Sequence, residues 1–168
     1  MTKAENVRIA MWSGPRNIST TMMRAFENRP DTIVVDEPFY ACYLKASGAD
    51  HPYREETLAA MSTDWREVVE QLGAPLPEGA SNLFQKHIAF HYPQGEPIDW
   101  LLDHRVFLLI RDPRAMVASY AKKFKDLAPV VESYVVERRI FDFLTARGRP
   151  CPIIDAGDVL NAPEAMLR

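Results

Sequence analysis

The stretch Trp12-Ser13-Gly14-Pro15-Arg16-Asn17-Ile18-Ser19-Thr20-Thr21 separates an apolar run at residues 7–12 from a helix-like segment at 22–26. In α/β proteins, a strand, a tight turn with a cation and then Ser or Thr at a helix start form an anion cradle. Backbone N–H groups and the helix dipole converge there. The sequence therefore predicts an anion-binding loop. The alternative is that the hydroxyls only cap the helix and that Arg16 is solvated.

This loop differs from a Walker A nucleotide loop at decisive positions. Counted from Gly14, that motif requires Gly at 19, Lys at 20 and Ser or Thr at 21, whereas the chain has Ser19, Thr20 and Thr21. The lysine that reaches the β- and γ-phosphates is missing, and Arg16 supplies a cation inside the turn instead. We therefore expect a phosphate or sulfate that belongs to no triphosphate, with the three hydroxyls as donors and no metal required.

A second anion motif follows the continuous apolar run at residues 107–110, which is typical of a strand buried on both faces. Arg111-Asp112-Pro113 ends this run and begins a predicted helix over 113–124. Ser119 lies two turns into that helix, at a rise of about 12 Å, so Arg111 can fold back and share an oxyanion with it. The alternative explanation of this motif is an ordinary helix start.

Strand-like and helix-like segments alternate along the chain, which indicates an α/β fold with a mostly parallel sheet flanked by helices. Predicted strands cover residues 7–12, 32–36, 83–88, 105–110 and 152–155, and predicted helices cover 19–27, 64–72, 113–124 and 130–147. The segment 41–81, punctuated by Pro and Gly, is expected to carry short helical pieces. Ligands of such folds bind at the carboxyl ends of the strands, where both anion motifs lie.

The two motifs together resemble those of the sulfotransferases, closest to the bacterial sulfotransferase-like proteins, from about Val7 to the end of the chain. Residues 12–21 look like the family's 5′-phosphosulfate loop, and Arg111-Asp112-Pro113 with Ser119 looks like its 3′-phosphate motif. The resemblance implies a P-loop NTPase-like sulfotransferase fold and 3′-phosphoadenosine 5′-phosphosulfate (PAPS) as the donor. Many members have Lys where this chain has Arg16, which keeps the charge but changes the hydrogen-bond geometry.

The resemblance also implies the site residues. The donor would be bound by Ser13, Gly14, Pro15, Arg16, Asn17, Ile18, Ser19, Thr20, Thr21, Arg111 and Ser119. Glu37, which follows the strand at 32–36, is the leading candidate for the general base that takes the acceptor's proton. Related enzymes use either a Glu near this point or a His after a later strand, so His87 and His91 are rival bases and Lys86 is a candidate charge stabiliser.

Composition narrows the class of protein. The chain has 168 residues, 47% hydrophobic and 26% charged, with a net charge of −3, which fits one domain over 1–168 and predicts neither a nucleic-acid nor a membrane partner. Cys42 and Cys151 indicate free thiols in a reducing compartment, so we expect a cytoplasmic protein. Four histidines give no convincing metal cluster. The sequence carries no signal for the oligomeric state.

The sequence leaves three other functions open: a P-loop-type nucleotide kinase, a non-catalytic module that binds phosphate or adenosine 3′,5′-bisphosphate (PAP), and a plain α/β scaffold. A kinase lacks support because the Walker A lysine is absent. The segment from Pro163 is predicted to be the first turn of a helix, while members of the family usually continue with a loop over the 3′-phosphate. We therefore expect a C-terminally truncated sulfotransferase that acts on a small-molecule acceptor.

Overall fold

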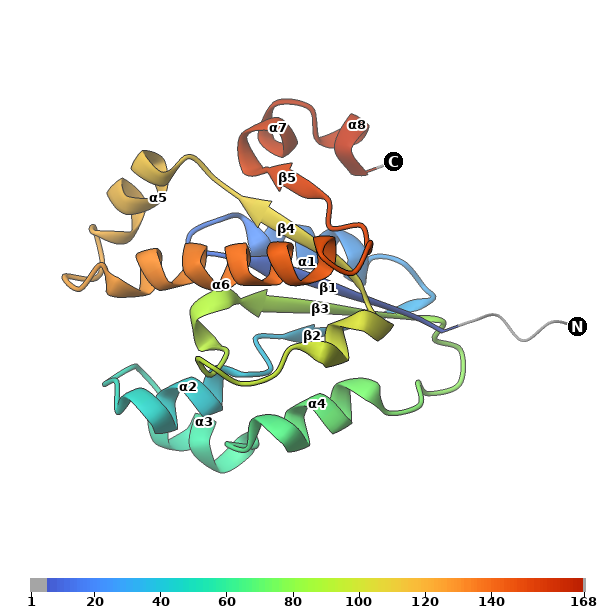
Figure 1. Ribbon diagram of the computed structural model, residues 1–168, viewed down its shortest axis with the longest axis horizontal. Helices are drawn as coiled ribbons and strands as arrows, with labels where there is room; N and C mark the ends of the chain where they lie inside the picture. Colours follow the sequence, from blue (N-terminus) through green and yellow to red (C-terminus); the bar gives the residue numbers. More distant parts are fainter. Residues whose placement is uncertain (1–5, 168) are drawn as a thin grey trace, which may run out of the picture.

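The computed structural model describes residues 6–167 and has a five-stranded parallel sheet at its centre. The strand order is β2-β3-β1-β4-β5, so β1 is central and pairs with β3 and β4 (Figure 1). The strands are β1 (Val7–Ser13), β2 (Thr32–Asp36), β3 (Asn82–Ile88), β4 (Arg105–Ile110) and β5 (Ile153–Asp155). Each predicted strand agrees with an observed one to within a residue at either end, and the predicted α/β architecture is confirmed.

Helices cover both faces of the sheet because successive side chains of each buried strand point to opposite sides. Met11 packs with Met22 and Val159 on one face, whereas Trp12 packs with Phe39 and Ile140 on the other. The helices are α1 (Ser19–Glu27), α2 (Tyr40–Ser47), α3 (Arg54–Ala60), α4 (Trp65–Gly73), α5 (Pro113–Tyr120), α6 (Ala128–Thr145), α7 (Ala156–Asn161) and α8 (Pro163–Leu167), with 3₁₀ turns η1 (Ala89–His91) and η2 (Asp99–Asp103). Among the helices at residues 6–167, none is both long and apolar enough to span a bilayer.

The helix predicted over 113–124 is shorter than expected, and that prediction is wrong at its end. The backbone N–H groups of Lys123 and Phe124 both donate to the carbonyl of Tyr120, which closes α5 into a turn. The side chain of Asp126 then accepts from the N–H of Ala128 at 2.9 Å, so α6 begins two residues before the predicted start at 130. The turn between the two helices projects Phe124 toward the carboxyl edge of the sheet, where it lines a cavity.

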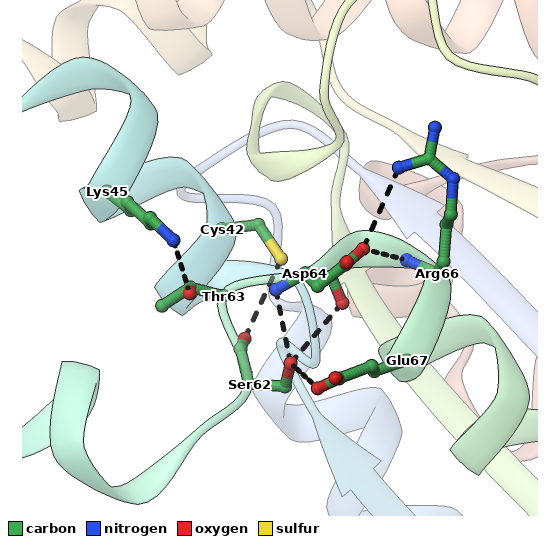
Figure 2. Close-up of polar contacts among 7 residues, drawn as sticks. All are labelled: Cys42, Lys45, Ser62, Thr63, Asp64, Arg66 and Glu67. Carbon is green, nitrogen blue, oxygen red and sulfur yellow. Dashed lines mark hydrogen bonds and ion pairs between the residues drawn. The ribbon is translucent and has the colours of Figure 1, made fainter.

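The segment between β2 and β3 forms three short helices, as expected for 41–81, and the turn before α4 ties them together (Figure 2). Asp64 caps α4 by accepting from the N–H of Arg66 at 2.9 Å. Ser62 accepts from the N–H of Asp64 and donates to Glu67 at 2.7 Å. The thiol of Cys42 on α2 donates to the Ser62 carbonyl, so the cap also anchors α2.

This cap leads to a test of the fold. Asp64→Ala is expected to lower the free energy of unfolding by about 1 kcal/mol, because the first turn of α4 loses its side-chain acceptor. Asp64→Asn keeps an acceptor oxygen and is expected to stay within a few tenths of a kcal/mol of the parent. Urea denaturation measures the free energy of unfolding of both variants. Equal losses in the two would show that the acceptor oxygen at position 64 does not stabilise α4.

Candidate functional site

A cavity of about 490 Å³ opens at the carboxyl edge of the sheet, where β1, β2, β3 and β4 end. Its walls come from the β1–α1 loop, the residues that follow β2 and β3, the β4–α5 junction and the turn after α5. The lining residues are Pro15, Arg16, Asn17, Ile18, Ser19, Thr20, Glu37, Tyr40, His51, Lys86, Ile88, Phe90, His91, Arg111, Ser119, Tyr120 and Phe124. The structure thus brings both anion motifs and most of the candidate catalytic residues to one cavity.

The N-terminus of α1, at this cavity, has no side-chain cap. Its N-cap residue is Ile18, whose side chain cannot accept a hydrogen bond, and the first turn contains no acidic residue. Asp64, Asp112 and Asp155 cap α4, α5 and α7, whereas α2, α3 and α6 lack a side-chain cap as α1 does. Because no side chain caps α1, its N–H groups and the positive end of its dipole are directed at the cavity and suit an anion.

The loop that leads into α1 is held in a strained conformation. Arg16 and Ile18 have φ angles of 64° and 53°, and Glu37 on the opposite wall has a φ of 46°. These are three of the four residues other than glycine with positive φ in the described part of the chain. Such backbone conformations cost about 1–3 kcal/mol each and concentrate at ligand sites. The strained backbone is therefore evidence that the β1–α1 loop and Glu37 have a functional role.

The two anion motifs contact one another directly. Arg111 donates from its guanidinium to the backbone carbonyl of Arg16 at 2.7 Å, and the Nε of Arg16 donates to the hydroxyl of Ser119 at 3.2 Å. Arg111 and Ser119 therefore both reach the same residue of the first loop, although Ser119 lies two turns into α5. Two guanidinium groups are in this way held on one side of the cavity.

Several predicted donor-binding residues make structural contacts, and of the four described here only Asn17 also lines the cavity. Asn17 is buried and donates from its amide to the Leu109 carbonyl at 2.5 Å, which ties the loop to β4. A Cβ on Gly14 would lie 2.8 Å from the end of Met116, so a side chain there would crowd α5. Ser13 is buried behind the loop and Thr21 is exposed on α1, and neither lines the cavity. Of the three hydroxyl residues at 19–21, the structure thus places Ser19 and Thr20 in the cavity lining but not Thr21.

Lys86, Asp36 and Glu37 form a compact charge cluster at the ends of β2 and β3. The buried ammonium of Lys86 lies 2.6 Å from Asp36 and 2.5 Å from Glu37. The other oxygen of Glu37 lies 3.6 Å from Nδ1 of His91. Burial, with the nearby Lys86 charge, lowers the pKa of His91 to about 3, so this imidazole is neutral near pH 7. Glu37 therefore faces one cation and one neutral ring.

His87 does not reach the cavity. It stacks on Trp12 with ring centroids 4.2 Å apart, is buried, and contacts Gln85 through Nε2 at 3.1 Å. Burial lowers its pKa well below the ordinary value. Because Lys86 faces the cavity and β-strand side chains alternate, the next residue must point to the opposite face. Of the three candidate bases, only Glu37 and His91 therefore line the cavity.

Sequence reasoning missed an aromatic wall that faces the anion loop. Tyr40 shares a hydrogen bond of 2.8 Å with Nδ1 of His51, and His51 lies 6.0 Å from the ring of Phe124. Phe90 and Tyr120 complete this wall. These residues come from four separate segments, and only the clustering of aromatic residues after β2 and β3 hinted at them. Within residues 6–167, no group of three or more His, Cys, Asp or Glu side chains could hold a metal ion.

In this parallel sheet the central strand leads through a cationic loop into an uncapped helix. This arrangement is typical of α/β proteins that hold phosphate or sulfate groups at a helix N-terminus. The comparison with protein families narrows this class. Residues 7–168 match the model of the sulfotransferase domain, and the chain belongs to this family. The predicted family is thereby confirmed, and it supports a sulfotransferase function in general terms.

Two proteins of Arabidopsis thaliana are similar to this chain. Branched-chain-amino-acid aminotransferase-like protein 2 is 37% identical over 164 residues, which cover 95% of this chain and 28% of that protein. Branched-chain-amino-acid aminotransferase-like protein 1 is 36% identical over 171 residues, which cover 98% of this chain and 29% of that protein. The chain thus spans under a third of the length of either relative, and their names describe those longer proteins.

The tie between Asn17 and β4 can be tested by its effect on stability. Asn17→Ala is expected to lower the free energy of unfolding by about 1–3 kcal/mol, because a buried hydrogen bond to the Leu109 carbonyl is lost. Thr21→Ala, an exposed change in the next turn, is expected to stay within about 0.5 kcal/mol of the parent. Chemical denaturation measures both, and a loss no larger for Asn17→Ala than for Thr21→Ala would contradict this role.

Proposed function

We propose that this chain is a sulfotransferase that uses PAPS and transfers its sulfuryl group to a hydroxyl or amine of a small molecule. One observation carries the proposal above all: Arg16 and Arg111 meet at one cavity, beside an uncapped helix N-terminus. Membership of the sulfotransferase domain family supports sulfuryl transfer in general. The family assignment does not specify the donor, the acceptor class or the roles of the residues. These are part of the proposal, which is argued from the geometry.

The β1–α1 loop fits the 5′ end of the donor. Bound PAPS would supply a sulfuryl group on a phosphate leaving group. The Arg16 guanidinium and the N–H groups of the first turn of α1 would then bind the 5′-phosphosulfate, and Ser19 and Thr20 would add hydroxyl donors from the same wall. These donors are fixed before binding, so they are suited to stabilise charge that grows on the bridging oxygen.

Arg111 and Ser119 fit the 3′-phosphate. Arg111 uses one of its five donors on the Arg16 carbonyl, which orients the guanidinium and leaves other donors for a ligand. Ser119 accepts from Arg16 and keeps its hydroxyl proton for a further acceptor. A ligand with a phosphate on the 3′ position would contact both residues, whereas ATP has no phosphate there. The pair would therefore select PAPS and PAP against ADP and ATP.

Glu37 is the residue best placed to act as the general base. Its carboxylate lines the cavity, and its side chain keeps 30% of its exposure, whereas His91 is buried with a pKa of about 3 and is a weak base. In the transfer step the acceptor oxygen or nitrogen would bond to sulfur, the bond from sulfur to the bridging oxygen would break, and the acceptor proton would pass to Glu37. Lys86 would balance the charge of the carboxylate before that transfer.

The donor assignment predicts a preference that calorimetry can measure. PAP is expected to bind more tightly than ADP or ATP, and Arg111→Ala is expected to weaken PAP binding by about ten- to a hundredfold, because the proposed charged hydrogen bond to the 3′-phosphate and the bond that holds the Arg16 carbonyl are both lost. Arg24→Ala removes an exposed arginine of α1 that pairs with Glu27 outside the cavity, and it is expected to leave PAP binding unchanged.

Two results of this experiment would overturn the donor assignment. One is tighter binding of ADP or ATP than of PAP by the parent chain. The other is equal PAP affinity in the parent and in Arg111→Ala. Turnover of Mg-ATP would instead support a nucleotide kinase.

The base assignment predicts a difference between two neighbouring carboxylates. Glu37→Gln and Asp36→Asn each remove one negative charge from Lys86, but only Glu37 lines the cavity. Release of PAP from PAPS, measured with a panel of small alcohols, phenols and amines, is expected to fall about 10²–10⁴-fold in Glu37→Gln and far less in Asp36→Asn. PAP affinity is expected to persist in both variants. Equal rates in the two variants would exclude Glu37 as the base.

A further inference from the structure

One buried acid of the protein lies outside the cavity and has no role in the proposed chemistry. Glu137 is on α6, which lies across a face of the sheet (Figure 1), and its side chain is almost fully buried. Ser133, one helical turn earlier, lies 3.5 Å from the position that a Cβ on Gly14 would occupy. The backbone N–H of Gly14 lies near enough to the Glu137 carboxyl group to lower its pKa, although neither carboxyl oxygen makes a hydrogen bond. Glu137 therefore lies directly behind the anion loop.

This acid has no charged partner within the described residues. Neither of its carboxyl oxygens makes a hydrogen bond of good geometry, and no ion pair involves it among residues 6–167. Burial raises the pKa of Glu137 to about 8, while the N–H of Gly14 opposes this shift in part. A carboxyl group in these surroundings is mostly protonated at pH 7. A neutral group thus occupies the space behind a loop that is suited to bind an anion.

We propose that Glu137 is a positioning residue of the anion loop: its neutral carboxyl supports Gly14 from behind, and its ionisation opposes anion binding. The inference rests on the proposed function, since it assumes that the β1–α1 loop binds the donor. A buried charge is poorly screened by salt, so an ionised Glu137 would act on a bound anion through the protein interior. An ionised Glu137 would also attract the N–H of Gly14 more strongly and so change the backbone conformation at the start of the strained turn.

The direction of the pH effect follows from linkage. An anion on the loop favours the protonated form of Glu137, so binding takes up a proton at pH values near 8. Affinity for the anion is therefore highest below the pKa of Glu137 and falls as the pH rises through it. The phosphate groups of PAP, with second pKa values near 6, are already fully ionised in that range.

Other groups around Glu137 do not explain such a dependence. The charged and titratable side chains on the elements packed around it are Arg8 on β1, Arg16 on the loop, His91 on η1, Arg114 and Tyr120 on α5, and Glu132, Tyr134, Arg138, Arg139 and Asp142 on α6. Burial lowers the pKa of His91 to about 3 and raises those of both tyrosines to about 12. Arginine keeps its charge throughout. Asp142 is exposed and pairs with Arg138, and a matched variant controls for Glu132.

Calorimetry of PAP binding between pH 7 and pH 9.5 tests the inference. The affinity of the parent chain is expected to fall by about ten- to thirtyfold over this range, and binding at pH 8 is expected to take up roughly half a proton. Glu137→Gln keeps the shape and an acceptor oxygen, so it is expected to bind PAP well at pH 7, to lose the pH dependence and to take up no proton. Glu132→Gln, on the same helix, is expected to behave as the parent.

Every outcome bears on the inference. Equal pH dependence in the parent and in Glu137→Gln would overturn it and leave the donor assignment intact. If PAP fails to bind at any pH, the donor assignment fails, and the same series with inorganic pyrophosphate decides the role of Glu137. Failure of pyrophosphate as well would overturn both. Should Glu137→Gln not fold, Glu137→Leu replaces it, with a flat pH profile expected and a lower affinity at pH 7 because the polar group near the Gly14 N–H is gone.

Discussion

Two hydrogen bonds hold the β1–α1 loop against the end of β4, and the candidate site depends on them. Asn17 donates to the Leu109 carbonyl, and Arg111 donates to the carbonyl of Arg16. Together they keep the loop in a conformation with two left-handed residues, Arg16 and Ile18, which a free loop would avoid. That conformation starts α1 at a residue that cannot cap it. The candidate site thus depends on contacts between the loop that follows β1 and the end of the neighbouring strand β4.

Most of the fold could be predicted because its determinants are local. Parallel strands buried on both faces are continuous apolar runs, and α1 begins and ends where the sequence predicts. The limit of α5 could not be predicted in the same way. Residues 121–125 carry no Pro or Gly, so a helix to Phe124 agrees with propensity. The structure ends it through the two hydrogen bonds that the Tyr120 carbonyl accepts, and Asp126 then accepts from the Ala128 N–H at the start of α6.

The sequence could predict the site residues that lie at the ends of strands. It could not predict those whose positions depend on the conformation of loops. The positions of Arg16, Glu37, Lys86 and Arg111 follow from the rule that ligands bind at the carboxyl ends of parallel strands. Separating His87 from His91 required the register, which pairs His87 with Trp12 and turns it into the core. The wall of Tyr40, His51 and Phe124 depends on how irregular segments fold back, and no periodic pattern encodes that.

The arrangement of charge suits the proposed chemistry, in which one small cavity would hold a highly anionic donor beside a carboxylate base. Guanidinium groups of Arg16 and Arg111 occupy one wall, while Glu37 is paired with Lys86 on another. Lys86 has a second partner in Asp36. In the proposed mechanism the buried ammonium would keep a carboxylate when Glu37 takes a proton, and the cost of an unpaired buried charge would be avoided. Asp36, which does not line the cavity, would then serve as the standing partner of Lys86 while Glu37 changes its charge.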